Sequence, residues 1–174
     1  MKNNEEQQLT SIENERNYTY FEVQAFRNPK SDIKLFCTFA ATSEKFIDQK
    51  YYRCNTCGLS AKKSMGICEH CMKCCHKGHD VCLAFDADAS VQSFCDCPGK
   101  CKCQCMPETN DLPCTACETN GKPINQPMFY CNDCDKSCEL LICQNCAIKF
   151  HHGHQLVYLG IVESEICQNE EFNK

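Results

Sequence analysis

The sequence predicts small zinc-stabilised domains that consist mostly of loops with short β-hairpins. Of the 174 residues, 21 are cysteines and none is a tryptophan. Many of the cysteines form Cys-x-x-Cys pairs, and histidines lie among them. The length allows one or two small domains, which bury too little apolar surface to be stable without metal ions or disulfides. A cysteine content this high is typical of such a scaffold.

Three further features favour metal ions over disulfides. The first residues are polar and lack the apolar segment of a secretory signal, and no apolar run is long enough to span a membrane. The number of cysteines is odd, and all six histidines lie inside cysteine clusters. A secreted disulfide scaffold gives no reason for that arrangement. We therefore expect zinc as the cofactor, a cytoplasmic and/or nuclear location, and no membrane partner.

The net charge of −5 is distributed unevenly along the chain. Residues 37–105 carry nine basic and seven acidic side chains, whereas residues 106–174 carry four basic and ten acidic ones. The first cysteine-rich region is thus slightly basic and the second is acidic. Neither has the strongly basic stripe that follows nucleic-acid phosphates, so we do not expect nucleic acid as a partner.

Residues 1–30 are expected to form a flexible N-terminal tail. Their first half is rich in Asn, Glu and Gln, and such a composition cannot offset chain entropy by burial. Within the tail, residues 18–27 alternate enough to form a strand or a docking segment. The apolar segment 33–39 follows and contains Cys37, which we expect to join a metal cluster from outside.

The strongest signal lies between residues 54 and 105. Two Cys-x-x-Cys pairs precede a His-x-x-His pair, and these residues are Cys54, Cys57, Cys68, Cys71, His76 and His79. A gap of two residues lets both side chains of a pair point to one ion, and tetrahedral zinc takes such sulfur and nitrogen ligands. The region then continues with further cysteines, namely Cys95, Cys97, Cys101, Cys103 and Cys105.

The order of these residues resembles the UBR box, the zinc domain with which N-degron ubiquitin ligases read their substrates. The resemblance covers about residues 36–105. It rests on Cys37-Thr-Phe, Cys54-x-x-Cys57-Gly-Leu, Cys68-x-x-Cys71, His76-Lys-Gly-His79-Asp80 and Phe94-Cys95-Asp96-Cys97. The Lys100-Cys101-Lys102-Cys103 ending is most similar to the subclass found in very large HECT-type ligases. We therefore expect a UBR-box-like zinc domain over residues 31–105.

The resemblance implies three zinc ions, two of which share one cysteine. The first ion would be held by Cys54, Cys57, His76 and His79. The second would be held by Cys37, Cys68, Cys71 and Cys95. The third would be held by Cys71, Cys97, Cys101 and Cys103, with Cys105 as a competing ligand. Cys74, Cys75, Cys82 and His70 are left over, and Cys75 is the best substitute among them.

The resemblance also implies a substrate site. In UBR boxes a free α-amine and a basic first side chain sit in a small acidic pocket, where hydrogen bonds between charged groups are strong. Asp96 matches the central acid of that pocket, and Phe94 matches the residue near it. The positions of the other two acids are occupied by Gly99 and, approximately, Ser60. The predicted substrate-binding residues are therefore Phe94 and Asp96.

A second cluster is predicted over residues 114–160, after a linker at residues 106–113. Its four pairs suit two zinc ions in a cross-brace. One set is Cys114, Cys117, Cys143 and Cys146, and the other is Cys131, Cys134, His151 and His154. Because the series ends in histidines it is no RING pattern; it resembles a B-box, with a ZZ finger as the near alternative. Cys138 could replace Cys134, and the acidic tail expected at residues 161–174 contains Cys167, which has no partner pattern.

Binding is the function that these scaffolds permit. About five zinc ions saturated by four ligands each leave no open coordination position for catalysis, and no catalytic motif is present. We expect a substrate-recognition or adaptor protein of the ubiquitin (N-degron) pathway that binds free protein N-termini. It would lack its own catalytic domain and could be a component of a ubiquitin ligase. The alternative is a zinc-scaffolded protein-interaction module without N-degron binding.

Overall fold

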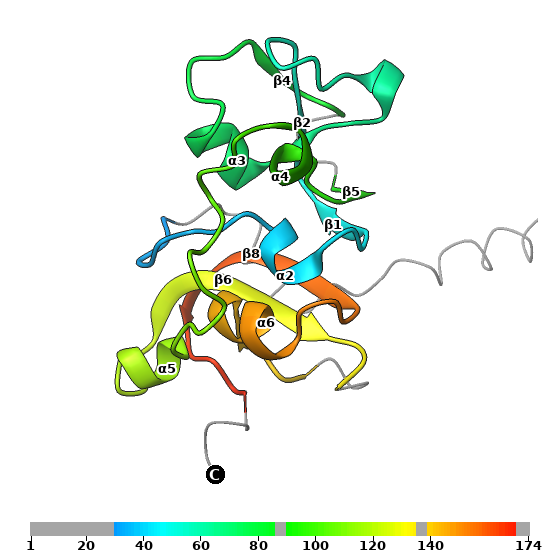
Figure 1. Cartoon of the computed structure of the whole chain (residues 1–174). Helices are drawn as coiled ribbons and strands as arrows, with labels where there is room; N and C mark the ends of the chain where they lie inside the picture. Colours follow the sequence, from blue (N-terminus) through cyan, green and yellow to red (C-terminus); the bar gives the residue numbers. More distant parts are fainter. Residues whose placement is uncertain (1–29, 86–89, 135–138, 170–174) are drawn as a thin grey trace, which may run out of the picture.

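Two small cysteine-rich modules lie one above the other in the computed structural model (Figure 1). The structure describes residues 30–85, 90–134 and 139–169. Residues 1–29, which contain nearly all of the predicted tail and the candidate strand at 18–27, lie outside the described residues. Within the described ranges, no helix has the length and apolar character needed to cross a membrane. The small sheets and few short helices confirm the predicted fold class.

The first module is built on two small antiparallel sheets. One has the strand order β3-β2-β4, and the other pairs β1 with β5. The strands are β1 (Ile47–Gln49), β2 (Tyr51–Cys54), β3 (Ile67–Cys68), β4 (Val81–Leu83) and β5 (Val91–Ser93). Three side chains from this region, Ile47, Leu59 and Ile67, are at most 1% exposed. With so few apolar residues to bury, the first module depends on its cysteines for much of its interior.

Short helical turns connect these strands. They are α2 (Phe39–Thr42), the 3-10 turn η1 (Ala61–Lys63), α3 (Glu69–Cys74) and α4 (Cys97–Lys100). Helix α4 has a proline at its start, where a missing N–H leaves no hydrogen bond unmade. Helix α3 lies between Cys68 and Cys75, and α4 begins at Cys97 and is followed by Cys101. These two turns therefore aim candidate ligand side chains.

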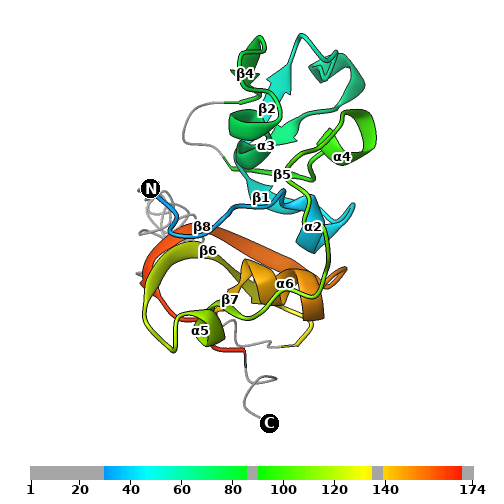
Figure 2. The ribbon, with the colours of Figure 1, turned by 60° about the vertical axis from the view of Figure 1, so that its left-hand side comes forward.

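The second module contains one antiparallel sheet of order β7-β6-β8. Its elements are α5 (Thr115–Glu118), β6 (Ile124–Cys131), β7 (Ile142–Cys143), α6 (Gln144–Phe150) and β8 (Leu156–Glu165). Figure 2 shows α6 lying against the long β6–β8 pair. The β6–β8 register shifts next to Pro127, which is where a residue without a backbone N–H is tolerated in a strand. Strand β8 continues past Gly160 to Glu165, into the segment predicted as an acidic tail.

A segment that precedes the first sheet packs against the second module. Phe36, Ala40 and Ala41 precede the first sheet, yet they belong to the apolar cluster of the second module. Figure 1 shows α2 between the sheets, close to α6. The side-chain amide of Gln144 fixes this segment from α6, because it accepts a bond from Phe36 N (3.1 Å) and donates one to Lys34 O (2.6 Å).

A second contact between the modules is polar and aromatic. The hydroxyl of Tyr158 on β8 lies 3.2 Å from Nε2 of His70 on α3, and the two rings meet edge to face at 6.3 Å. Burial lowers the pKa of His70 and raises the pKa of Tyr158, so both groups stay uncharged at neutral pH. An uncharged His70 can accept the hydrogen bond that Tyr158 donates.

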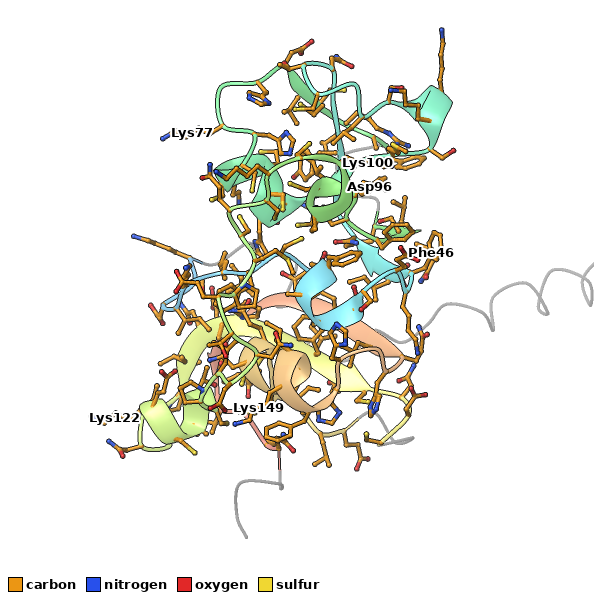
Figure 3. All side chains as sticks on the ribbon, viewed as in Figure 1. Phe46, Lys77, Asp96, Lys100, Lys122 and Lys149 are labelled. Atoms are coloured by element: carbon orange, nitrogen blue, oxygen red, sulfur yellow. The ribbon has the colours of Figure 1, made fainter. Side chains whose placement is uncertain are left out.

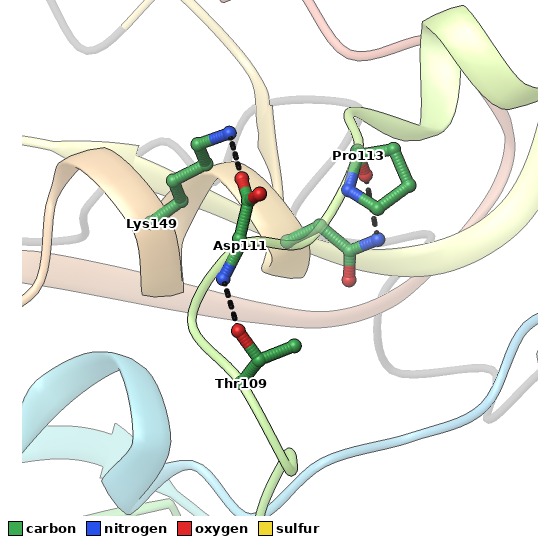
Figure 4. A network of polar contacts seen from close by, with 5 residues as sticks. Thr109, Asp111, Pro113 and Lys149 are labelled. Atoms are coloured by element: carbon green, nitrogen blue, oxygen red, sulfur yellow. Dashed lines mark hydrogen bonds and ion pairs between the residues drawn. The ribbon is translucent and has the colours of Figure 1, made fainter.

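The stretch at residues 106–113, predicted as a linker, lies along the second module (Figure 4). The Lys149 ammonium pairs with the Asp111 carboxylate, and Asp111 N donates to Thr109 Oγ1 at 3.0 Å. The side chain of Asn145 donates to Pro113 O at 2.8 Å. Lys149 also lowers the pKa of Asp111, which agrees with an exposed ion pair that stabilises weakly. The connection between the modules is thus docked on α6.

Candidate zinc centres and recognition pocket

The first candidate centre consists of Cys54, Cys57, His76 and His79, whose ligand atoms lie within 4.8 Å of one another. Nδ1 of His79 lies 3.3 Å from Cys57 Sγ and 3.5 Å from Cys54 Sγ. A tetrahedral zinc with ordinary bond lengths has sulfur–nitrogen edges of about 3.5 Å. The spacing of these atoms therefore fits zinc, and the structure brings together the four residues that the sequence predicted.

The local backbone explains why this pair of cysteines converges. Cys54 ends β2, and a tight turn then returns to Leu59 through the paired bonds Cys54 N to Leu59 O (3.1 Å) and Leu59 N to Cys54 O (2.9 Å). Gly58 has a φ of 68° in this turn, a conformation that glycine adopts without a steric penalty. The turn places Cys57 beside Cys54. Burial and the charge of His79 lower the pKa of His76, which favours the neutral, ligand form of its ring.

The second candidate centre consists of Cys37, Cys68, Cys71 and Cys95, and all four are buried. Cys37 Sγ and Cys68 Sγ are 3.9 Å apart, close to the sulfur–sulfur edge of about 3.8 Å in a zinc tetrahedron. Cys68 N donates to Cys95 Sγ at 3.3 Å, which offsets negative charge on that sulfur. The structure thus assembles the predicted set, including Cys37 from outside the motif.

The third candidate centre differs from the prediction at one position. Its members are Cys71, Cys75, Cys97 and Cys103, so Cys75 takes the place expected for Cys101. Cys75 follows α3 directly and lies four residues after Cys71, which puts both side chains on one helical face. Their common neighbour Cys103 has its sulfur 3.6 Å from that of Cys71 and 3.9 Å from that of Cys75.

Cys71 belongs to both the second and the third set, as a shared ligand would. A further link joins the third set to the first, because His76 Nε2 lies 3.4 Å from Cys97 Sγ. If His76 uses Nδ1 for the first ion, its Nε2–H can donate to this sulfur, an arrangement common around metal ligands. Of the remaining thiols, Cys105 is buried and lies 3.5 Å from Cys75 Sγ, whereas Cys101 is partly exposed.

The fourth candidate centre also differs from the predicted set at one position, and the residue there comes from a distant segment. Cys114, Cys143, Cys146 and Cys167 form a buried set, whereas the predicted ligand Cys117 is exposed on α5. The sulfur of Cys167 lies 3.7 Å from that of Cys146 and accepts the N–H of Cys143 at 3.2 Å. Hydrogen bonds from the neighbouring thiols, first that of Cys114, lower the pKa of Cys143 and so favour the thiolate that zinc needs.

The position of Cys167 follows from β8. This strand continues to Glu165 and pairs with β6 as far as Ile124, so the chain returns over the module before it reaches Cys167. Cys117 is not part of this buried set because α5 begins at Thr115 and carries Cys117 outward. An unpaired cysteine after an apolar strand was the sequence signal that could have indicated the place of Cys167 in this buried set.

The fifth candidate centre contains Cys131, Cys134, His151 and His154, as predicted. Nδ1 of His154 lies 3.5 Å from Cys131 Sγ, and Nδ1 of His151 lies 3.4 Å from Cys134 Sγ. These edges again fit zinc. The fourth and fifth sets alternate along the chain as in a cross-brace, but Cys167 of the fourth set follows His154 of the fifth, which the prediction did not include. Cys138, the alternative to Cys134, lies outside the described residues.

The cysteines and histidines that the prediction left over have distinct environments. Cys74 and Cys82 are exposed. His70 is buried at the contact between the modules, and His152 bonds to Ser43 at 2.9 Å. Only Cys75 among the leftover residues of the first module enters one of the five named sets.

A pocket of about 300 Å³ opens beside the first module and includes both predicted substrate-binding residues. Its lining residues are Phe46, Tyr51, Arg53, Ser64, Phe85, Val91, Gln92, Ser93, Phe94 and Asp96. In Figure 3, Phe46 and Asp96 appear on the same side of this module. The pairing of β1 with β5 sets Ile47 opposite Ser93, so the flanking residues Phe46 and Phe94 meet edge to face at 5.3 Å. The volume is that of a site for a small ligand or a side chain.

Asp96 is held in place by bonds to two neighbouring elements. Its Oδ2 accepts the Tyr51 hydroxyl and the Gly66 N–H, both at 2.7 Å, and Asp96 N donates to Gly66 O at 2.9 Å. Burial raises the pKa of Tyr51 first, and the Asp96 carboxylate raises it further. Both bonds to the carboxylate use the same oxygen, so Oδ1 is the atom of Asp96 that can accept from a ligand.

Among the pocket residues that the sequence prediction missed, Arg53 is the charged one. It lies two residues after Tyr51 on β2, so both side chains share one face of the strand. The guanidinium carbon lies 5.1 Å from the centre of the Tyr51 ring, and one terminal nitrogen donates to Met65 O. The Tyr-Tyr-Arg-Cys sequence carried a usable signal, because strand alternation puts Tyr51 and Arg53 on the same side.

Residues 34–104 match the model of the UBR box family, which confirms the resemblance predicted from sequence. The E3 ubiquitin-protein ligase hyd of Drosophila melanogaster is 40% identical over 70 residues, 40% of this chain and 2% of that protein. A probable E3 ubiquitin-protein ligase of Dictyostelium discoideum is 46% identical over 61 residues, 35% of this chain and 1% of the relative. The auxin transport protein BIG of Oryza sativa subsp. japonica is 38% identical over 74 residues, 40% of this chain and 1% of the relative.

The chain therefore spans only a small part of these curated relatives. What is shared is the zinc-binding UBR box, a module that occurs in ubiquitin ligases. The second module has its own zinc-type clusters outside the matched segment.

Proposed function

We propose that this chain is a zinc-built recognition or adaptor protein of the ubiquitin pathway, and that the pocket around Asp96 binds free protein N-termini. The observation that carries the proposal is the position of Asp96 in a 300 Å³ pocket, beside Phe94 and with its carboxylate fixed by Tyr51 and Gly66. A fixed carboxylate loses little freedom when an ammonium group binds, and hydrogen bonds between charged groups are strong.

We further propose that about five zinc ions support this function, three in the first module and two in the second. The five ligand sets are thiolate-rich and have four members each, which leaves no open position for a catalytic water. In this role the ions are scaffolds, and ubiquitin transfer depends on a ligase partner. The isolated chain should then build no ubiquitin chains with activating and conjugating enzymes alone.

The decisive experiment is calorimetry with a free-amine peptide and its acetylated copy. Acetylation removes the charge of the amine and should abolish binding. Asp96→Asn removes the carboxylate charge, and because bonds to charged groups contribute roughly 1.5–3 kcal/mol, binding should weaken about ten- to a hundredfold. Asp48→Asn is the matched control, because Asp48 is an exposed acid of the same module outside the pocket.

A second candidate function is a protein-interaction module without N-terminus binding. It is favoured by the two bonds that Asp96 Oδ2 already accepts, because they give the carboxylate a structural role of its own. The same calorimetry separates the two. If acetylation leaves the affinity unchanged, and Asp96→Asn binds as the wild type does with unchanged zinc content, Asp96 is only a structural residue and the N-terminus proposal is wrong.

A further inference from the structure

The walls of the Asp96 pocket are mainly apolar and partly aromatic. Phe46, Phe85, Phe94 and Val91 line it together with Tyr51. Phe46 is 55% exposed and Phe85 is 51% exposed, which is unusual for two large aromatic side chains beside one pocket. Rings at the edge of a pocket offer a large contact area to an apolar group that enters it.

The described lining of the pocket carries one acidic and one basic side chain. Among its ten lining residues, Asp96 and Arg53 are the charged ones, and the others are uncharged. The Tyr51 ring connects them, because its hydroxyl donates to Asp96 and its face lies against the Arg53 guanidinium. No ion pair within 4.0 Å joins Arg53 to Asp96 in the described part of the chain. Arg53 therefore contributes a fixed positive charge that the single carboxylate does not neutralise by direct contact.

A peptide N-terminus brings one positive charge with its amine, and Asp96 can accept it. A first residue of lysine or arginine brings a second positive charge into the same pocket. Among the described residues that line the pocket, no second carboxylate is present for that charge, and Arg53 repels it. An apolar first side chain needs no second carboxylate and is not repelled by Arg53, and it gains contact with the aromatic rings.

We propose that the pocket selects protein N-termini whose first side chain is apolar, and that Arg53 is the residue that rejects lysine and arginine there. This inference rests on the proposed binding of free N-termini and adds the class of first residue. Arg53 acts as a specificity determinant through its charge, whereas Asp96 binds the amine of every accepted peptide.

The test uses the full chain, loaded with zinc, and peptides that differ only at the first residue. Phenylalanine, leucine, arginine, lysine and glutamate are compared at that position, with an acetylated phenylalanine peptide as the amine control. We expect the phenylalanine or leucine peptide to bind at least about tenfold tighter than the arginine and lysine peptides. The acetylated peptide should not bind.

Two variants isolate the charge of Arg53. Arg53→Gln removes it and should bring the arginine peptide to within a fewfold of the phenylalanine peptide. Arg53→Lys keeps it and should retain the discrimination even though the flat contact with Tyr51 is lost. Lys122→Gln is the control for net charge, because Lys122 is exposed on the second module, far from the pocket (Figure 3). Zinc content, measured for each variant, confirms that the module remains folded.

The outcomes distinguish a failure of the selection for apolar first residues from a failure of the proposed N-terminus binding. If the arginine peptide binds the wild type as tightly as the phenylalanine peptide, and acetylation abolishes both, the selection inference is overturned while N-terminus binding stands. Tightest binding of the glutamate peptide would also overturn it, since Arg53 would then attract an acidic side chain. If acetylation changes nothing, the proposed function itself fails.

Discussion

The replacement of Cys167 by serine tests the most specific structural difference from the sequence prediction. Structural zinc contributes on the order of 10–16 kcal/mol to folding, so an equal share for one of four ligands is about 2.5–4 kcal/mol. That share corresponds to a zinc affinity roughly a hundred- to a thousandfold weaker. Cys167 is 7% exposed and its sulfur also accepts the Cys143 N–H, so serine at this position removes a buried sulfur from the candidate set.

Chelator competition measures this loss directly. Cys167→Ser should release one zinc ion at a chelator concentration that leaves the wild type intact, and the second module should unfold at a lower temperature. Cys117→Ser is the matched control, because sequence spacing favoured Cys117 but its side chain is exposed. If Cys117→Ser loses the ion and Cys167→Ser keeps it, the buried set described for the fourth centre is wrong.

Three other substitutions test the remaining features. Cys75→Ser should lower the zinc content of the first module by one ion, whereas Cys74→Ser, at an exposed neighbouring thiol, should leave the metal count unchanged. Leu141→Ala should cost about 2–5 kcal/mol of unfolding free energy because Leu141 is 2% exposed, and Leu140→Ala at a 40% exposed side chain should cost much less in the same denaturant titration. The raised pKa of Tyr51 means that its contribution to stability is fully present below its usual pKa of 10.0 and is lost as pH rises beyond it. The stability difference between the wild type and Tyr51→Phe should therefore stay constant up to about pH 10 and shrink above it; a difference that grows there would contradict the assignment.

Ligands that are close in sequence were predictable, whereas those brought in by long-range folding were not. The set of Cys54, Cys57, His76 and His79 follows from spacing, because a two-residue gap restricts where both side chains can point. Cys75 was ranked only as a substitute, although its position four residues after Cys71 fits one face of a helical turn. The position of Cys167 depends on the length and register of β8, and no local sequence pattern indicates that length or register.

The pocket residues likewise divide into those predictable from a sequence pattern and those brought in by long-range folding. Asp96 and Phe94 were predicted from a family pattern, and both line the pocket that the structure contains. Phe46 and Phe85 come from segments distant in sequence, and their arrival at one site depends on strand pairing. The contact between the modules was unpredictable for a related reason. The sequence showed an apolar segment before Cys37 but gave no sign of which module would bury Phe36.

The packing of residues 30–41 on the second module has a consequence for synthesis on the ribosome. Phe36 N bonds to the side chain of Gln144, which lies 108 residues later in the chain. At a synthesis rate of about 5–20 residues per second, roughly 5–20 seconds pass between the appearance of these two residues. In the last part of that interval, after Cys103 has been made, all ligands of the first module are available to zinc, but Phe36, Ala40 and Ala41 still have no surface to cover them. A nascent chain arrested before α6 should therefore hold zinc in its first module while it still exposes this apolar segment to chaperones.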